Sequence, residues 1–260
     1  MNPHRHVASA TARRTLVDNT DPWFRRYPVD APVARLVCLP HAGGTAGVFH
    51  HLAASLAPGI ELLAVQYPGR QDRLEHSWPR SLEHLAEEIA ARLPPYLDVP
   101  VAVFGHSLGA SVAYETARRI EDWYPGSLTR VCVSGRAAPS GDAYDPGPLD
   151  DEALVDWAIG LGGPGSEVYT DPGLRALLLP ALRGDLRLLR AYRPAGIVRL
   201  KAPVTAFGGA ADPTCPPEEL ATWADVTASG FDFRIFQGDH FYLVPQAAAL
   251  AAEISSRIRG

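Results

Sequence analysis

Short apolar runs alternate along the chain with longer segments of helical periodicity. The apolar runs predict strands at residues 36–39, 61–66, 99–104, 130–134, 203–207 and 231–236. The helical patterns predict helices at residues 49–56, 82–93, 110–120, 218–224 and 246–258. Strands that alternate with helices are typical of a mostly parallel sheet covered by helices on both faces. The pattern therefore predicts an α/β fold with such a sheet at its centre.

One long segment, residues 139–194, departs from this alternation because it contains no strand pattern. Connections in α/β proteins normally take only a few residues. Within the segment, residues 150–161 are predicted as a helix with acids in its first turn, and residues 181–192 as a second helix that Pro180 opens. We interpret the segment as a helical lid inserted over the carboxyl edge of the sheet. The alternative is a small subdomain with no role at the active site.

Composition narrows the class of protein. The chain has 260 residues, of which 47% are apolar, which is ordinary for one large globular domain. We expect residues 1–20 to be a disordered extension and residues 21–260 to form that domain. No apolar run approaches the length of about 18 residues that spans a membrane, and the beginning of the chain has no hydrophobic signal core.

Charge and cysteine usage exclude some partners and compartments. The formal net charge of −5 argues against nucleic acid as the main partner. The three cysteines are an odd number, and two of them lie in apolar strand-like runs, where a thiol usually acts as a small core side chain. This usage favours a reducing, cytoplasmic location.

The most informative motif is the pentapeptide GHSLG at residues 105–109, which lies between a predicted strand and a predicted helix. A G-x-S-x-G turn in that context is the nucleophile elbow of α/β-hydrolases. Its two glycines permit a sharp turn that raises the hydroxyl of Ser107 above the backbone. The first N–H groups of the helix that follows point toward a developing oxyanion. The motif predicts an α/β-hydrolase with Ser107 as its nucleophile.

A serine nucleophile needs a base, and in this fold an acid and then a histidine follow it along the chain. His240 is the only one of the nine histidines that lies C-terminal to Ser107, so we assign it as the base. Asp212 follows a predicted strand at the carboxyl edge of the sheet, and we favour it as the acid. Asp239 and Asp232 are the alternatives, although one adjoins His240 in sequence and the other opens a strand at its wrong end.

The oxyanion hole should combine two backbone N–H groups. Leu108, immediately after the nucleophile, supplies the first. The segment PHAGG at residues 40–44 follows the first predicted strand and offers the second, which we assign to Ala42, because glycines there let the backbone approach a substrate. An ordinary glycine turn is the alternative. No spacing of histidines and carboxylates predicts a metal site.

Five motifs in the expected order carry a resemblance to one family. They are residues 38–44 (CLPHAGG), 67–70 (YPGR), 105–110 (GHSLGA), 208–213 (GGAADP) and 238–241 (GDHF). Together they resemble the type II thioesterases, free-standing enzymes associated with polyketide and nonribosomal peptide synthases, over roughly residue 23 to the C-terminus. The chain departs from many members in having Leu108 in place of Met and Asp239 in place of a second Gly.

The resemblance implies hydrolysis of acyl groups from the phosphopantetheine thiol of acyl or peptidyl carrier proteins, for editing or for product release. It also implies a triad of Ser107, Asp212 and His240, in agreement with the assignment from the residues. No cofactor is implied. We expect a cytoplasmic monomer that binds neither nucleic acid nor membranes.

Charge along the inserted segment suggests where a carrier protein docks. Its first part, up to residue 170, carries seven acidic residues and no basic one, whereas residues 171–201 carry seven basic residues and two acids. Carrier proteins are typically acidic, so we predict that Arg183, Arg187 and Arg190 steer one toward the site. In the alternative interpretation, the two parts of the segment pair with each other or face water.

Two further groups of residues are candidates for contact with the substrate. Arg70 and Arg73 either meet the phosphate of the pantetheine arm or form salt bridges within their loop. Leucines of the inserted segment either line an acyl chamber or only pack the helices; they are Leu174, Leu177, Leu178, Leu179, Leu182 and Leu186. Two other functions stay open: a carboxylesterase for small free esters, and a non-catalytic binding protein with a hydrolase fold.

Overall fold

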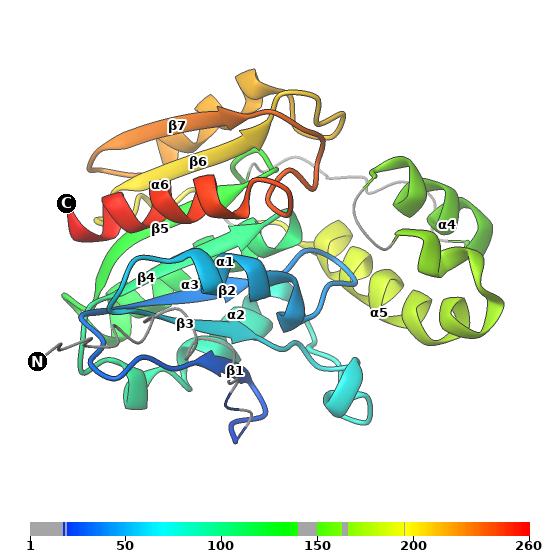
Figure 1. The fold of residues 1–260 in the computed structure, drawn as a ribbon, viewed down its shortest axis with the longest axis horizontal. Helices are drawn as coiled ribbons and strands as arrows, with labels where there is room; N and C mark the ends of the chain where they lie inside the picture. The colour runs from blue at the N-terminus through cyan, green and yellow to red at the C-terminus, as the bar shows by residue number, and fades with distance from the viewer. Residues whose placement is uncertain (1–17, 19, 140–149, 163–165, 195) are drawn as a thin grey trace, which may run out of the picture.

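The sheet predicted from the apolar runs is the centre of the structure, a computed structural model that describes residues 18, 20–139, 150–162, 166–194 and 196–260. These residues form seven strands in the order β1-β3-β2-β4-β5-β6-β7, of which only β1 is antiparallel to its neighbour (Figure 1). The strands are β1 (Phe24–Tyr27), β2 (Ala34–Leu39), β3 (Ile60–Val65), β4 (Val101–His106), β5 (Leu128–Ser134), β6 (Val204–Gly209) and β7 (Phe231–Phe236).

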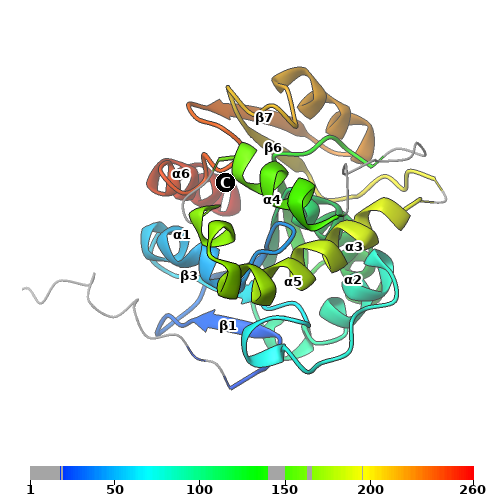
Figure 2. The ribbon, with the colours of Figure 1, turned by 90° about the vertical axis from the view of Figure 1, so that its right-hand side faces the viewer.

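Helices cover both faces of this sheet. Helices α1 (His50–Ser55) and α6 (Ala247–Arg259) lie on one face, and α2 (Leu82–Ala90) and α3 (Leu108–Trp123) lie on the other (Figures 1 and 2). Side chains of β2 alternate between the two faces: Leu36 packs with α1 and α6, whereas Val37 packs with α2 and α3. Because both faces are buried, the central parallel strands are largely apolar, whereas β7, at the edge of the sheet, is partly exposed and carries Asp232 and Arg234. The predicted α/β-hydrolase fold is confirmed.

Five 3₁₀ helices complete the described elements. They are η2 (Ala46–Phe49), η3 (Gln71–Arg73), η4 (Pro94–Tyr96), η5 (Ser166–Thr170) and η6 (Pro217–Val226). The helix predicted at residues 218–224 is therefore of the 3₁₀ type. Among the described residues no helix combines the length and the apolar character needed to cross a membrane.

The segment between β5 and β6 contains two helices, α4 (Asp151–Gly160) and α5 (Pro172–Ala191), which we call the cap helices. Figure 1 shows α4 and the first part of α5 beyond the edge of the sheet, whereas the last part of α5 packs against α3. The cap helices have a small core of their own; its buried members are Leu154, Val155, Ala158, Leu179, Leu182 and Leu186. The helix predicted at residues 150–161 is confirmed, and the Asp150 side chain caps it by accepting a hydrogen bond from the Ala153 N–H at 3.0 Å.

The predicted start of the second cap helix is wrong, because α5 begins at Pro172 and contains Pro180 in its interior. Asp171 caps the helix through the Leu174 N–H at 2.9 Å, and Pro172 occupies the first turn, where the missing N–H costs nothing. Pro180 has no backbone N–H, so α5 lacks one of its intrahelical hydrogen bonds. Both Pro180 and Ala176, whose carbonyl loses its donor, are exposed, so water can satisfy that carbonyl.

One strand was not predicted. β1 has only four residues, FRRY, and lies at the edge of the sheet, where two arginines interrupt the apolar pattern. Arg26 pairs there with the buried carboxylate of Glu61, with Nε and Oε1 2.6 Å apart. The predicted disordered extension, residues 1–20, lies outside the described residues apart from Asp18 and Thr20, as do residues 140–149 and 163–165 of the predicted lid.

Candidate active site

Ser107 stands at the turn between β4 and α3 with φ of 56° and ψ of −120°, a conformation that costs a residue with a side chain about 1–3 kcal/mol. The flanking glycines make the turn possible. A Cβ added at Gly105 would lie 1.9 Å from the Gly109 carbonyl oxygen, and one at Gly109 would lie 2.1 Å from the Leu39 carbonyl oxygen. The Ser107 N–H donates to the Ser134 carbonyl at 2.8 Å. The local geometry is that of a nucleophile elbow.

His240 and Asp212 lie within hydrogen-bonding distance, with His240 Nδ1 2.7 Å from Asp212 Oδ2. Their side chains are almost completely buried. Burial raises the pKa of the Asp212 carboxyl, but hydrogen bonds from His240 and Thr214 outweigh it and leave this pKa below its ordinary value. Asp212 is therefore ionised at neutral pH and accepts the Nδ1 proton, which leaves Nε2 of His240 free to act as a base.

The two alternative acids have other partners. The exposed Asp239 accepts from the Phe241 N–H at 2.8 Å, which forms a short turn. Asp232 pairs with Arg257, with an N–O distance of 2.6 Å. Of the three carboxylates considered from the sequence, the structure brings only that of Asp212 to the histidine.

Thr214 is a member of this group that the sequence analysis missed. Its hydroxyl donates to Asp212 Oδ1 at 2.7 Å, and its N–H donates to the same oxygen at 2.9 Å. The two bonds orient the carboxylate so that its other oxygen faces His240. The signal in the sequence is the triplet DPT at residues 212–214, since an Asp side chain often accepts from the N–H two residues on.

Two more histidines surround the base. The rings of His106 and His240 have centroids 4.8 Å apart, and those of His41 and His106 are 6.1 Å apart. Burial, together with His240 and Arg70, lowers the pKa of His41 to about 3. Burial also holds the pKa of His106 well below its ordinary value. Both rings are therefore neutral at neutral pH and add no charge beside His240.

A cavity of about 350 Å³ opens over Ser107 and His240. Its floor includes the loop at residues 40–44, which we call the oxyanion loop, and its roof comes from the cap helices and η5. The roof residues are mostly apolar; they include Trp157, Leu161, Tyr169, Leu178 and Leu182. The size and lining suit an acyl group whose carbonyl carbon reaches the serine.

The leucines considered from the sequence therefore divide into three sets. Leu178 and Leu182 line the cavity, and Leu182 also belongs with Leu179 and Leu186 to the cap core. Leu174 and Leu177 are about half exposed and face away from this core.

Two backbone N–H groups are in place as candidate oxyanion donors. Leu108 is the first residue of α3, where an N–H has no partner within the helix. In the oxyanion loop, the Gly44 N–H donates to the His41 carbonyl at 2.9 Å and the Gly43 N–H to the Asp185 carboxylate at 2.8 Å. Neither bond uses the Ala42 N–H, and Ala42 lines the cavity beside Ser107.

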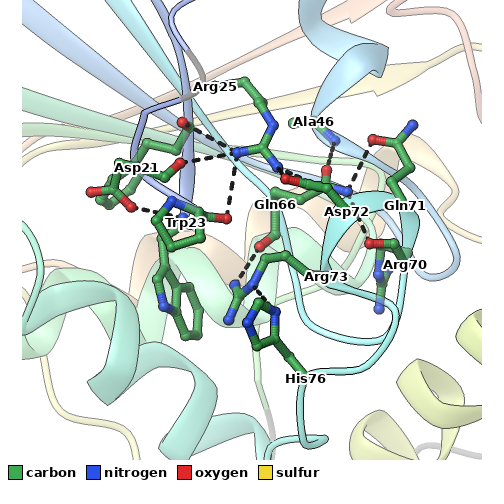
Figure 3. Close-up of polar contacts among 12 residues, drawn as sticks. Asp21, Trp23, Arg25, Ala46, Gln66, Arg70, Gln71, Asp72, Arg73 and His76 are labelled. Carbon is green, nitrogen blue, oxygen red and sulfur yellow. Dashed lines mark hydrogen bonds and ion pairs between the residues drawn. The ribbon is translucent and has the colours of Figure 1, made fainter.

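Arg70 and Arg73 are both buried and bonded within the protein. Arg70 forms a bidentate pair with Asp185 of α5. Arg73 donates to the Gln66 carbonyl at 2.7 Å, and its guanidinium lies 3.8 Å above the ring of Trp23. Figure 3 shows Arg73 directed at Gln66 and His76. Both guanidinium groups are thus engaged inside the protein, but Arg70 pairs with the cap and Arg73 makes hydrogen bonds and a ring contact, so the salt bridges expected within the loop are not what holds them.

The three arginines of the cap differ in their surroundings. Arg183 pairs with Asp151 of α4, so the two parts of the inserted segment do pair at this point. Arg187 and Arg190 are exposed on α5. No cluster of three or more His, Cys, Asp or Glu side chains suited to a metal ion occurs among the residues that the structure describes.

Comparison with known proteins agrees with this geometry. The thioesterase domain family matches residues 34–258. The probable cadicidin biosynthesis thioesterase of Streptomyces griseus is 39% identical over 98% of this chain and 70% of its own length. Thioesterase PikA5 of Streptomyces venezuelae is 41% identical over 91% of this chain and 85% of its own length.

A solved structure supports the same assignment. The type II thioesterase BorB from the borrelidin biosynthetic cluster superposes with a TM-score of 0.83 and 38% identity, covering 93% of this chain and 100% of that one. The resemblance to type II thioesterases inferred from the motifs is confirmed. The chain belongs to the thioesterase domain family.

Proposed function

We propose that the chain hydrolyses acyl thioesters on the phosphopantetheine thiol of carrier proteins, with Ser107, His240 and Asp212 as its catalytic triad. The observation that carries the proposal is the hydrogen bond of 2.7 Å between His240 and Asp212, at a cavity that Ser107 and His240 both line. Support for the substrate class comes from the relatives, which are named as a thioesterase of cadicidin biosynthesis, a thioesterase, and a type II thioesterase of the borrelidin biosynthetic cluster.

In the first half of the reaction, His240 Nε2 takes the proton of the Ser107 hydroxyl while its oxygen attacks the thioester carbonyl carbon. The negative charge that develops on the carbonyl oxygen is stabilised by the N–H groups of Ala42 and Leu108. The carbon–sulfur bond then breaks, and the imidazolium of His240 returns its proton to the leaving thiolate. The products are a free carrier thiol and an acyl ester on Ser107.

In the second half, His240 accepts a proton from a water molecule, whose oxygen attacks the acyl-serine ester. The same two N–H groups stabilise the second oxyanion, and His240 protonates Ser107 as the ester bond breaks. The carboxylic acid leaves and the enzyme is restored. Asp212 stays ionised throughout and stabilises the imidazolium that forms in each half.

The proposed setting is a monomer in the cytoplasm, serving a polyketide or nonribosomal peptide pathway by editing or product release. Cys38, Cys132 and Cys215 are all buried and unpaired, which suits a reducing compartment. The apolar cavity suits an acyl chain.

The direct test compares three substrates that carry the same acyl group: a carrier-protein thioester, an N-acetylcysteamine thioester and an oxygen ester. We expect kcat/KM to be highest for the carrier thioester, because the protein partner adds binding energy that the small substrates lack. A preference for the oxygen ester would identify a carboxylesterase instead. Absence of turnover on all three, with no labelling of Ser107 by a fluorophosphonate, would identify a binding protein.

Exposed arginines of α5 are the proposed docking site for the acidic carrier. Arg187→Glu/Arg190→Glu should raise KM for the carrier thioester at low salt, because it repels the partner. Added salt should erase much of the difference, since the screening length is about 10 Å at 0.1 M ionic strength. We leave Arg183 unchanged because it pairs with Asp151.

The N-acetylcysteamine thioester is the control for the arginine variant, because it lacks the charge of the carrier. Turnover of this small substrate should stay at the parental rate. Equal losses on both substrates would show that the arginines support the structure of the cap, and no loss on either would place the docking surface elsewhere.

A further inference from the structure

We propose that Asp185 of α5 and Arg70 are positioning residues for the oxyanion loop, so that the cap itself holds one half of the oxyanion hole in place. The inference rests on the proposed function. It assigns a role to the YPGR motif at residues 67–70, which the catalytic triad leaves unexplained.

Asp185 reaches from the cap helix into the base of the active site. Its side chain is 2% exposed, and its Oδ2 accepts both the Gly43 N–H at 2.8 Å and Arg70 Nη1 at 2.7 Å. Its Oδ1 accepts Arg70 Nη2 at 2.7 Å. A buried carboxylate bonded in this way has little freedom to move. The Gly43 N–H is therefore fixed relative to α5.

Arg70 contacts the same loop directly. Its Nη1 also donates to the Gly44 carbonyl at 2.9 Å. The neighbouring Tyr67 hydroxyl donates to the Pro40 carbonyl at 3.3 Å, so the motif contacts both ends of the oxyanion loop. Loop and cap thus meet through side chains that water does not reach.

The loop that carries Arg70 is itself anchored. Gln66 accepts the Ala46 N–H at 2.8 Å and donates to the Gln71 side chain at 3.0 Å (Figure 3). In Figure 3, Gln66 lies between Ala46 on one side and the segment bearing Arg70 and Gln71 on the other. The anchor fixes Arg70 relative to the chain that leaves the oxyanion loop.

These contacts matter because the proposed oxyanion donor, Ala42, immediately precedes Gly43. A donor stabilises the oxyanion only when it lies within about 2.7–3.1 Å of the charge, and a displacement of 1 Å can cost about 10²-fold in rate. Gly43 has φ of +74°, and a Cβ added there would lie 3.2 Å from Leu182 Cβ, so α5 packs directly on the loop. Leu182 also lines the cavity. An acyl chain bound there would therefore contact α5, the helix that holds the oxyanion loop.

Asp185→Asn tests the proposal, since it keeps an oxygen for the Gly43 N–H but removes the charge that orders Arg70. On the N-acetylcysteamine thioester we expect kcat to fall ten- to a hundredfold with KM within twofold of the parental value. Asp151→Asn is the matched control, because it removes the partner of Arg183 within the cap and does not touch the oxyanion loop. Its kcat should be unchanged.

The double variant Arg70→Met/Asp185→Leu separates positioning from stability. Replacing both members of a buried ion pair by apolar side chains is often neutral for folding, whereas removing one member is costly. We expect its melting temperature to be closer to the parental value than that of Asp185→Leu, while kcat stays low, because the Gly43 N–H and the Gly44 carbonyl have lost their partners. Recovery of kcat together with the melting temperature would overturn the proposal, as would parental kcat in Asp185→Asn.

Turnover by the parental enzyme shows whether a failure concerns the proposed function or the positioning role. If the parental enzyme hydrolyses no thioester, the proposed function fails, and the rate at which a fluorophosphonate modifies Ser107 then replaces kcat in the same comparison. That reaction also develops negative charge on an oxygen in the oxyanion hole, so the variants should rank in the same order. A different order would overturn the positioning role.

Discussion

Ser107→Ala is expected to abolish thioester hydrolysis, with a loss in kcat on the order of 10⁵–10⁶-fold, because no other group can form the acyl ester. The weak residual rate should come from the oxyanion hole acting on water. The melting temperature should not fall, because the hydroxyl supports no contact of the core. Turnover of an acyl thioester and mass spectrometry of the acyl-enzyme, before and after the substitution, measure the effect.

Ser111→Ala is the matched control, since Ser111 lies one turn further along α3. Its hydroxyl accepts a hydrogen bond from Arg136 at 2.8 Å and does not line the cavity. We expect it to retain turnover within a few-fold of the parental enzyme. If Ser107→Ala kept an acyl-enzyme signal, another residue would be the nucleophile.

Asp212→Asn should lower kcat on the order of 10⁴-fold, as expected when the imidazole is held in the wrong tautomer. The amide NH₂ can donate to His240 Nδ1, which would move the ring proton to Nε2 and block the base. Because the pKa of Asp212 already lies below its ordinary value, the carboxylate is ionised throughout the neutral range. Protonation of Asp212 should therefore not limit the parental rate within that range.

Asp239→Asn is the control for the acid, since Asp239 adjoins His240 but bonds the Phe241 N–H. An amide oxygen can still accept that hydrogen bond, so we expect kcat within a few-fold of the parental value. A severe loss in Asp239→Asn together with a nearly normal Asp212→Asn would show that the acid is wrongly assigned.

The fold, and the candidate site residues that the structure brings together, were predictable because their signals are local. The central parallel strands are buried on both faces, so each gives a largely apolar run in the sequence, and the elbow serine has a glycine two positions before and two after it. Asp212 and His240 could be assigned because an acid and then a histidine follow the nucleophile along the chain in this fold. β1 escaped prediction because an edge strand of four residues with two arginines has no such run.

The positioning residues were not predictable, because their partners are distant in sequence. Arg70 and Asp185 are 115 positions apart, and neither residue shows from its neighbours that it is buried. Asp185 lies among the basic residues of α5, where an isolated acid suggests an exposed helical ion pair. The start of α5 was misplaced for a related reason, since Pro180 is a good start signal and only its exposure explains why the helix tolerates it.

The contact between α5 and the oxyanion loop limits how the enzyme can be re-engineered. An obvious way to alter acyl specificity is to graft a cap from another enzyme, since the cap lines much of the cavity. A graft that lacks an acid at position 185 would leave the Arg70 guanidinium buried without its counter-ion and the Gly43 N–H without its acceptor. Cap and YPGR motif therefore form one exchangeable unit, although Arg70 and Asp185 are 115 positions apart, and chimaeras should be cut so that both come from the same parent.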